Sequence, residues 1–127
     1  CLFAVVGNGP AYGGGYYATP KALPYDKILD FTVVETISKL KILKFLKTYE
    51  RGKHETLSCC DVGNCESLEF KCEKAVPINL DGEIIMRDSV RFELVPQAIN
   101  FVVPKSVAQK IKAREDFSQK DLILNVK

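Results

Sequence analysis

The sequence has 127 residues, a length that fits one domain or a large part of one. Hydrophobic residues make up 46% of it and charged residues 27%, which suits a protein with a buried core and a polar surface. The net charge of +2 is too small to indicate nucleic-acid binding, and no apolar run reaches the roughly 18–20 residues of a membrane span.

The first part of the chain predicts a strand and a glycine loop. Residues 2–6 are an apolar run that predicts a strand, and no signal peptide is recognisable before it. Because the chain starts at Cys1, we expect a fragment or a processed product. The loop at residues 12–16 (YGGGY) is either a flexible connection or a place where a ligand can approach the backbone closely. Its candidate cleft residues are Asn8, Gly9, Gly13, Gly14 and Gly15.

A change of hydrophobic period marks a strand followed by a helix. Residues 28–37 are rich in β-branched side chains and predict a strand, whereas residues 38–49 (SKLKILKFLKTY) have a helical period that Gly52 ends. Lys41, Lys44 and Lys47 lie on one side of this helix, as a solvated face or a contact for anionic lipid headgroups. The opposite, apolar arc is expected to face the core and comprises Ile42, Leu43, Phe45, Leu46 and Tyr49.

The rest of the chain predicts mainly strands. We expect them at residues 67–73, 76–80, 83–86, 90–95, 98–103 and 121–126, and a basic helix at residues 105–114. Asp81-Gly82 between apolar runs indicates a tight type I′ hairpin. The predicted fold is mainly β, all-β to α+β: an antiparallel β-sandwich or partly open barrel at residues 1–104 with one lysine-rich helix, and a basic helix or strand tail at residues 105–127.

The five cysteines indicate a reducing, cytoplasmic environment, because an odd number without a signal peptide does not suggest a disulfide framework. A zinc-stabilised structural domain is one alternative, with Cys59, Cys60, Cys65 and Cys72 as ligands and His54 close by. Their spacing lacks the paired C-x2-C of structural zinc sites, so buried or half-buried free thiols are the favoured interpretation.

Several motifs follow one another in a fixed order. They are an apolar strand ending in GNG with a GGG loop after it, a P-x-A-L segment with an aspartate, a strand, a lysine-rich helix ending in RGKH, LDGE at residues 80–83, and FELVPQAINFVVP at residues 92–104. Their order and wording resemble the C-terminal half of the bacterial diacylglycerol kinase–like lipid kinases, a family that includes sphingosine and ceramide kinases. The resemblance covers about residues 2–104. LDGE and the closing V-P-x-A-x-x-F-x-V-P are its most specific parts.

The resemblance implies the second domain of a two-domain enzyme, with the active site in the cleft between the domains. Such enzymes transfer the γ-phosphate of ATP to a lipid hydroxyl. It implies Glu83 as the proton acceptor and Asp81, Gly82 and Glu83 as residues that border the nucleotide; without the resemblance, Glu83 would be taken for a solvated side chain. The glycine-rich GGDG motif of the ATP-binding domain is absent, so we expect that only the full-length parent binds ATP and Mg²⁺ productively and that this chain alone is inactive.

The resemblance also implies a structural magnesium site that some bacterial members have. Its ligands here would be the Leu23 carbonyl, the Asp26 carboxylate and the Ile28 carbonyl. The family usually has glycine after this aspartate, whereas this chain has Lys27, whose ammonium group would repel the ion.

The alternative function is a non-catalytic β-sandwich module that holds a lipid, another ligand or a partner with the loop at residues 12–17. For the kinase, the expected acceptor is a diacylglycerol-like or sphingoid lipid. We expect a cytoplasmic protein, peripheral at the inner face of the membrane. Copies of a partial sandwich are expected to pair through exposed strand edges.

Overall fold

The computed structural model describes residues 1–96, 98–100, 102–109 and 111. Its first compact unit, Cys1–Leu94, contains a three-stranded sheet of order β1-β2-β3 and a two-stranded sheet of β4 and β5, both antiparallel. The mainly β, antiparallel prediction is therefore confirmed. The strands are β1 (Phe3–Gly7), β2 (Leu29–Val34), β3 (Cys60–Cys65), β4 (Ser67–Leu80) and β5 (Glu83–Glu93).

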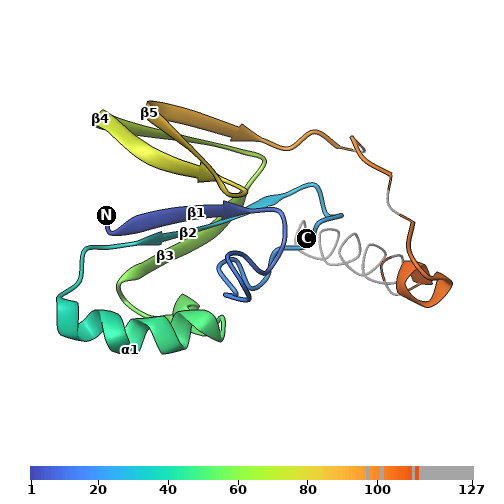
Figure 1. Cartoon of the computed structure of the whole chain (residues 1–127). Coiled ribbons are helices and arrows are strands. Elements are labelled where there is room, and N and C mark those ends of the chain that lie inside the picture. Colours follow the sequence, from blue (N-terminus) through green and yellow to red (C-terminus); the bar gives the residue numbers. More distant parts are fainter. Residues whose placement is uncertain (97, 101, 110, 112–127) are drawn as a thin grey trace, which may run out of the picture. The chain divides into compact units, whose positions relative to one another are not determined.

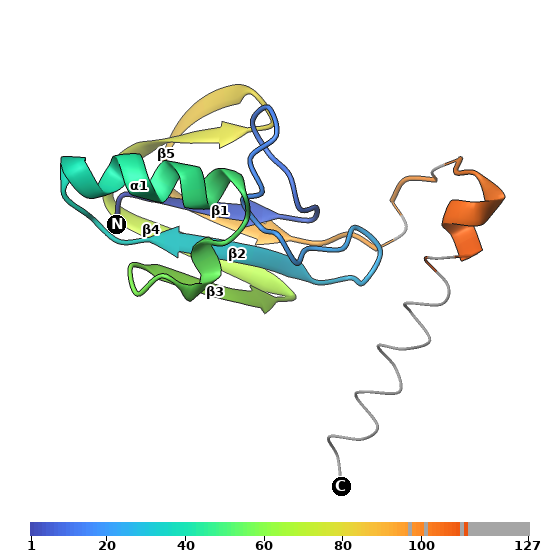
Figure 2. The same cartoon turned by 90° about the horizontal axis from the view of Figure 1, so that it is seen from below.

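Two helical elements join β2 to β3. They are α1 (Lys39–Glu50) and the short 3₁₀ helix η1 (His54–Thr56). Figures 1 and 2 show α1 lying along one face of the three-stranded sheet, with the β4–β5 hairpin on the other side of that sheet. The central strand, β2, pairs with β1 on one edge and β3 on the other, so alternate β2 side chains face α1.

The main core lies between α1 and the sheet. Its buried members are Ala18, Val34, Phe45 and Tyr49, and Phe3 packs against them from β1. The rings of Phe45 and Tyr49 stack with centroids 5.3 Å apart, and Phe3 meets Tyr49 edge-on at 5.4 Å. Each fully buried large apolar side chain contributes about 1.5–3 kcal/mol, so these contacts fix α1 on the sheet.

Buried polar groups complete this core beside η1. The Thr32 hydroxyl donates to the Ala18 carbonyl at 2.9 Å and lies 3.4 Å from His54 Nε2. Since the single hydroxyl proton is used, Nε2 carries the imidazole proton and donates to Thr32. His54 is fully buried, and its Nδ1 has no hydrogen-bond partner among the described residues. Burial lowers the pKa of His54, which keeps the ring neutral.

The end of α1 follows the prediction. Gly52 has φ 65°, its N–H donates to the Tyr49 carbonyl at 2.9 Å, and the N–H of Lys53 donates to the Thr48 carbonyl at 3.0 Å. These bonds satisfy carbonyls that the helix leaves unpaired. A Cβ at Gly52 would come within 2.9 Å of Tyr17 and Pro20, so glycine also permits close packing here.

The predicted apolar arc of α1 is wrong in two places. Phe45 and Tyr49 are buried and Ile42 is half-buried, but Leu43 is 67% and Leu46 42% exposed. The buried stripe is narrow because it is centred on Phe45 and Tyr49, which are four residues apart. At 3.6 residues per turn, Leu43 projects about 160° away from Phe45.

The strand boundaries also differ from the prediction. The four segments predicted at residues 67–73, 76–80, 83–86 and 90–95 are two long strands, β4 and β5, whose register shifts between Lys71 and Val76. Cross-strand apolar pairs such as Leu68–Phe92 and Ile78–Ile85 align the hairpin. The strand β3 was not predicted, and its sequence is considered in the Discussion.

The chain beyond Leu94 belongs to a second compact unit that begins at Val95. The predicted strand at residues 98–103 is wrong for the residues described there, because none of them is extended in a sheet. A strand needs a hydrogen-bonded neighbour, which alternation alone does not supply. Residues 105–109 and 111 are helical, as predicted, and the strand expected at residues 121–126 lies outside the described residues.

Candidate functional site

The turn that joins β4 to β5 has the predicted type I′ geometry. Asp81 and Gly82 have φ values of 50° and 106°, and Leu80 pairs with Glu83 to close the ladder. The Gly82 N–H donates to Asn79 Oδ1 at 2.8 Å, which further holds the turn. A type I′ turn requires positive φ at both central positions, and Asp81 and Gly82 meet this requirement. The turn therefore fixes the direction in which Glu83 leaves the backbone.

The three predicted residues of this motif are exposed at the end of the hairpin. Asp81, Gly82 and Glu83 are all solvent-accessible, and neither carboxylate is in a salt bridge of the described residues. A carboxylate without a cationic partner keeps its oxygens available to accept a proton or a hydrogen bond. The arrangement can thus present Glu83 to a molecule outside this chain.

The glycine loop is held by backbone hydrogen bonds at its base, and its glycines are exposed to solvent. Tyr12 and Tyr16 exchange backbone hydrogen bonds of 2.8 and 3.1 Å, and the Thr19 hydroxyl donates to the Gly9 carbonyl at 2.8 Å. Asn8 is exposed, and a Cβ added at any of Gly13, Gly14 or Gly15 would meet nothing within 4 Å. No hydrogen bond or salt bridge among the described residues joins this loop to the Asp81–Gly82 turn. That the two share one cleft stays a prediction.

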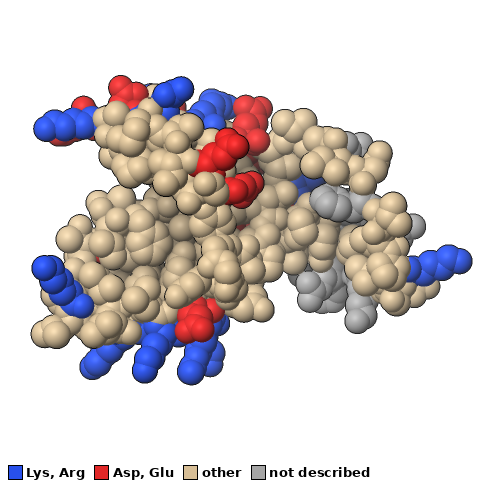
Figure 3. Space-filling view, viewed as in Figure 1, with Lys and Arg blue, Asp and Glu red and all other residues tan. Residues whose placement is uncertain are grey.

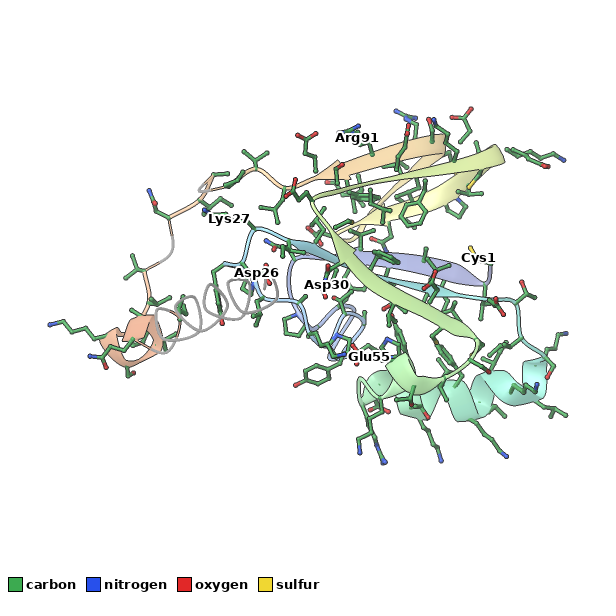
Figure 4. All side chains as sticks on the ribbon, turned by 180° about the vertical axis from the view of Figure 1, so that it is seen from behind. Cys1, Asp26, Lys27, Asp30, Glu55 and Arg91 are labelled. Atoms are coloured by element: carbon green, nitrogen blue, oxygen red, sulfur yellow. The ribbon has the colours of Figure 1, made fainter. Side chains whose placement is uncertain are left out.

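The predicted magnesium ligands belong to one turn before β2, where Figure 4 labels Asp26 and Lys27. Asp26 Oδ1 accepts the Ile28 N–H at 3.1 Å, and the Asp26 N–H donates to the Leu23 carbonyl at 3.3 Å. One carboxylate and two carbonyls are the oxygen donors that Mg²⁺ prefers. Within the described part of the chain, no group of three or more His, Cys, Asp or Glu side chains could hold a metal. The ligand set stays a prediction.

Lys27 adopts the backbone that glycine would adopt at this position, with φ 64°. A left-handed conformation costs an L-residue roughly 1–2 kcal/mol of folding free energy. Glycine avoids this strain, but its greater conformational freedom in the unfolded chain lowers stability by about 0.4–1 kcal/mol. Lys27→Gly is therefore expected to stabilise the protein by about 0.5–1 kcal/mol in urea unfolding. Removing the ammonium group is also expected to increase the gain in melting temperature that Mg²⁺ produces.

Lys53→Gly is the matched control for Lys27→Gly. Lys53 has φ −102°, so glycine relieves no strain there and is expected to lower stability. A Lys27→Gly protein that is as unstable as Lys53→Gly would mean that the positive φ is not a source of strain. Equal responses of both proteins to Mg²⁺ would argue against the ligand set.

A polar pocket that sequence reasoning missed lies between β2, β3 and η1. Its volume is about 230 Å³, and Lys21, Asp30 and Glu55 contribute its charges. Lys21 Nζ is 2.7 Å from Glu55 Oε2. Burial, followed by the charges of Asp26 and Glu55, raises the pKa of Asp30, and Lys21 opposes the rise. The sequence contained one signal for this pocket: side chains alternate between the two faces of a strand, which places Asp30 on the same face of β2 as Thr32.

The cysteines do not form the zinc site considered as an alternative. All five are free, and the described residues contain no cluster that could hold a metal, so that alternative is wrong. Cys59, Cys60 and Cys65 are half-buried as expected, and burial together with Cys59 raises the pKa of Cys60 to about 11. Cys72 is exposed, contrary to prediction, because the register shift after Lys71 interrupts the alternation.

None of the helices in the described residues is long and apolar enough to cross a bilayer.

Comparisons with known proteins give the family. The model of the YegS C-terminal NAD kinase beta sandwich-like domain matches residues 1–103. The chain is 34% identical over 97 residues to a probable YegS-like lipid kinase of Shewanella frigidimarina, covering 76% of this chain and 31% of that protein. A second probable YegS-like lipid kinase, from Chromohalobacter salexigens, is 30% identical over 103 residues, covering 81% of this chain and 33% of that protein.

A more distant relative has a more specific name. The diacylglycerol kinase of Mycobacterium tuberculosis is 26% identical over 99 residues, covering 78% of this chain and 32% of that enzyme. No solved structure matches the chain. The chain spans about a third of the length of these curated relatives. The predicted resemblance is confirmed: the chain belongs to the YegS C-terminal domain family, the second domain of the diacylglycerol kinase–like lipid kinases.

Proposed function

We propose that this chain is the part of an ATP-dependent lipid kinase that supplies the Asp81-Gly82-Glu83 side of the active site. The parent enzyme transfers the γ-phosphate of ATP to the hydroxyl of a diacylglycerol-like or sphingoid lipid. The family match and the names of the relatives support the kinase class. The observation that carries the role of Glu83 is the type I′ turn at the end of the hairpin. It presents this carboxylate exposed and, within the part of the chain that the structure describes, in no salt bridge.

The chemistry assigns one step to this chain. As the lipid oxygen bonds to the γ-phosphorus and ADP leaves, the hydroxyl proton passes to the Glu83 carboxylate. Gly82, which has no side chain, lets the nucleotide approach the backbone of the turn. Mg²⁺ bound with ATP supplies charge neutralisation on the phosphates. The ATP-binding domain of the parent provides the phosphate site, so the chain alone lacks activity.

We further propose that the parent works in the cytoplasm at the inner face of the membrane. Its acceptor is a lipid whose hydroxyl lies at the bilayer surface, and ATP reaches that surface from the cytoplasm. A second domain that contacts the bilayer would keep the hydroxyl near Glu83.

The test is a transfer assay with the full-length parent and the 127-residue chain side by side. Each is incubated with γ-labelled ATP, Mg²⁺ and vesicles that contain diacylglycerol or a sphingoid base. Labelled lipid is expected with the parent only. Failure of the parent to label any lipid would overturn the kinase proposal and favour the non-catalytic binding module. Labelled lipid from the chain alone would contradict its predicted inactivity.

A further inference from the structure

The outer side of α1 exposes a row of leucines. Leu40 is 83%, Leu43 67% and Leu46 42% exposed. Their spacing of three residues places them on one side of the helix, away from Phe45, which is 3% exposed. α1 is thus apolar on two sides, and only one of them is covered within the described part of the chain. Three exposed leucines on one side of a helix form an apolar strip, and such strips mark interaction surfaces.

Lysines outnumber acidic residues along α1. The helix has four lysines and one glutamate, Glu50, which is exposed at its last position, seven residues after Leu43. None of these lysines takes part in a salt bridge of the described residues. Figure 3 shows basic side chains projecting in a row along the side of the molecule where α1 lies. The leucine–lysine face is defined by Lys39, Leu40, Leu43, Lys44, Leu46 and Lys47.

We propose that the leucine–lysine face docks on the surface of a bilayer that contains anionic lipids. α1 lies in the plane of the interface, with Leu40 and Leu43 inserted at the level of the acyl-chain boundary and Lys44 and Lys47 against lipid phosphates. This is the pattern of an interfacial amphipathic helix, in which apolar burial and charge attraction act together. The combination favours a lipid surface over an acidic protein, because both the charges and the leucines find partners there.

The docking deepens the proposed membrane location of the parent by naming the face that makes the contact, but it does not depend on the kinase chemistry. Membrane binding by this face needs no ATP, no Glu83 and no second domain. Within the kinase, it would keep the domain at the membrane, while the β4–β5 hairpin with Glu83 lies on the other side of the sheet from α1 (Figures 1 and 2). Vesicle binding and phosphoryl transfer can therefore fail separately, and one result does not decide the other.

The test measures partitioning of the 127-residue chain onto vesicles by co-sedimentation, with phosphatidylcholine alone or with added phosphatidylglycerol. Binding is expected only with the anionic lipid, and 0.5 M salt is expected to weaken it, since screening shortens the reach of the lysine charges. Lys44→Gln with Lys47→Gln is expected to weaken binding about 25-fold, from about fivefold for each charge. Leu40→Ser with Leu43→Ser is expected to weaken it at least about tenfold.

Matched controls come from the β4–β5 hairpin. Ile84 and Met86 are 68% and 54% exposed, so Ile84→Ser with Met86→Ser removes similar apolar surface elsewhere. Lys71→Gln with Lys74→Gln removes two exposed charges. Both controls are expected to bind like the wild type, and circular dichroism checks that every variant is folded.

Four outcomes would overturn the proposal. The first is no binding of the wild-type chain to anionic vesicles. The second is equal binding by the leucine variant, which would leave only charge adsorption. The third is an equal loss of binding in the hairpin controls, which would remove the specificity for α1. The fourth is a full-length parent that does not bind anionic vesicles although the chain does, because the rest of the protein would then cover this face.

Discussion

Replacing Glu83 with glutamine in the full-length parent is expected to lower kcat by about 10²- to 10⁴-fold, the range that general acid–base catalysis contributes. Glutamine keeps the size and shape of the side chain but cannot accept the hydroxyl proton. The side chain is exposed just after the turn and makes no salt bridge among the described residues, so the melting temperature is expected to stay unchanged. Transfer rates at saturating ATP and thermal unfolding of the same preparation measure both effects.

A second glutamate on the same hairpin provides the control. Glu73 is exposed on β4, at the register shift and away from the Asp81-Gly82 turn, and Glu73→Gln removes the same charge. Its rate is expected to match the wild type. If both variants kept a near-normal rate, Glu83 would not be the proton acceptor. If both lost activity equally, the cause would be the charge of the hairpin rather than a proton transfer at one residue.

The parts of the fold that the sequence predicted are those determined by local chemistry. The type I′ turn needs only Asp81 and Gly82, whose φ values are both positive. The end of α1 needs only Gly52 and the carbonyls of the preceding turn. In both places the backbone conformation selects the residue type, so a short stretch of sequence contains all the necessary information.

The missed strand depends on its neighbour instead. Residues 60–65 read Cys-Asp-Val-Gly-Asn-Cys, without clean alternation and with residues that strands usually avoid. They become β3 because six of their residues pair in register with β2. Gly63 lies opposite Phe31, and a Cβ there would come within 2.7 Å of the ring. That glycine is required by a side chain more than 30 positions away, which no local pattern reveals.

The candidate site divides in the same way. The turn that presents Glu83 is local and was predicted from the sequence, whereas the set of Leu23, Asp26 and Ile28 came only from the family resemblance and stays a prediction. The polar pocket was not predicted, because its charged residues come from distant segments of the chain: Lys21, Asp30 and Glu55. The exposure of Leu43 was missed for a related reason. A helical wheel gives the width of the apolar arc but not which part of it meets the sheet.

Phe45→Ala is expected to lower the free energy of unfolding by about 3–5 kcal/mol, the usual cost of removing a phenylalanine ring from a packed core. Phe45 is 3% exposed, and its ring lies 6.0 Å from that of Phe3 and 5.3 Å from that of Tyr49. The ring thus joins α1 to β1, and its loss leaves a cavity between helix and sheet. Urea unfolding followed by circular dichroism measures the change.

Leu43→Ala tests the opposite side of the same helix. Leu43 is 67% exposed, so its truncation is expected to change the free energy of unfolding by less than about 0.5 kcal/mol. The two substitutions remove apolar atoms from positions two residues apart. The difference between their effects on the free energy of unfolding shows which face of α1 is buried. A loss at Leu43 as large as that at Phe45 would mean that another part of the protein covers the outer face. In that case the leucines would be core residues, and the leucine–lysine face could not reach a membrane.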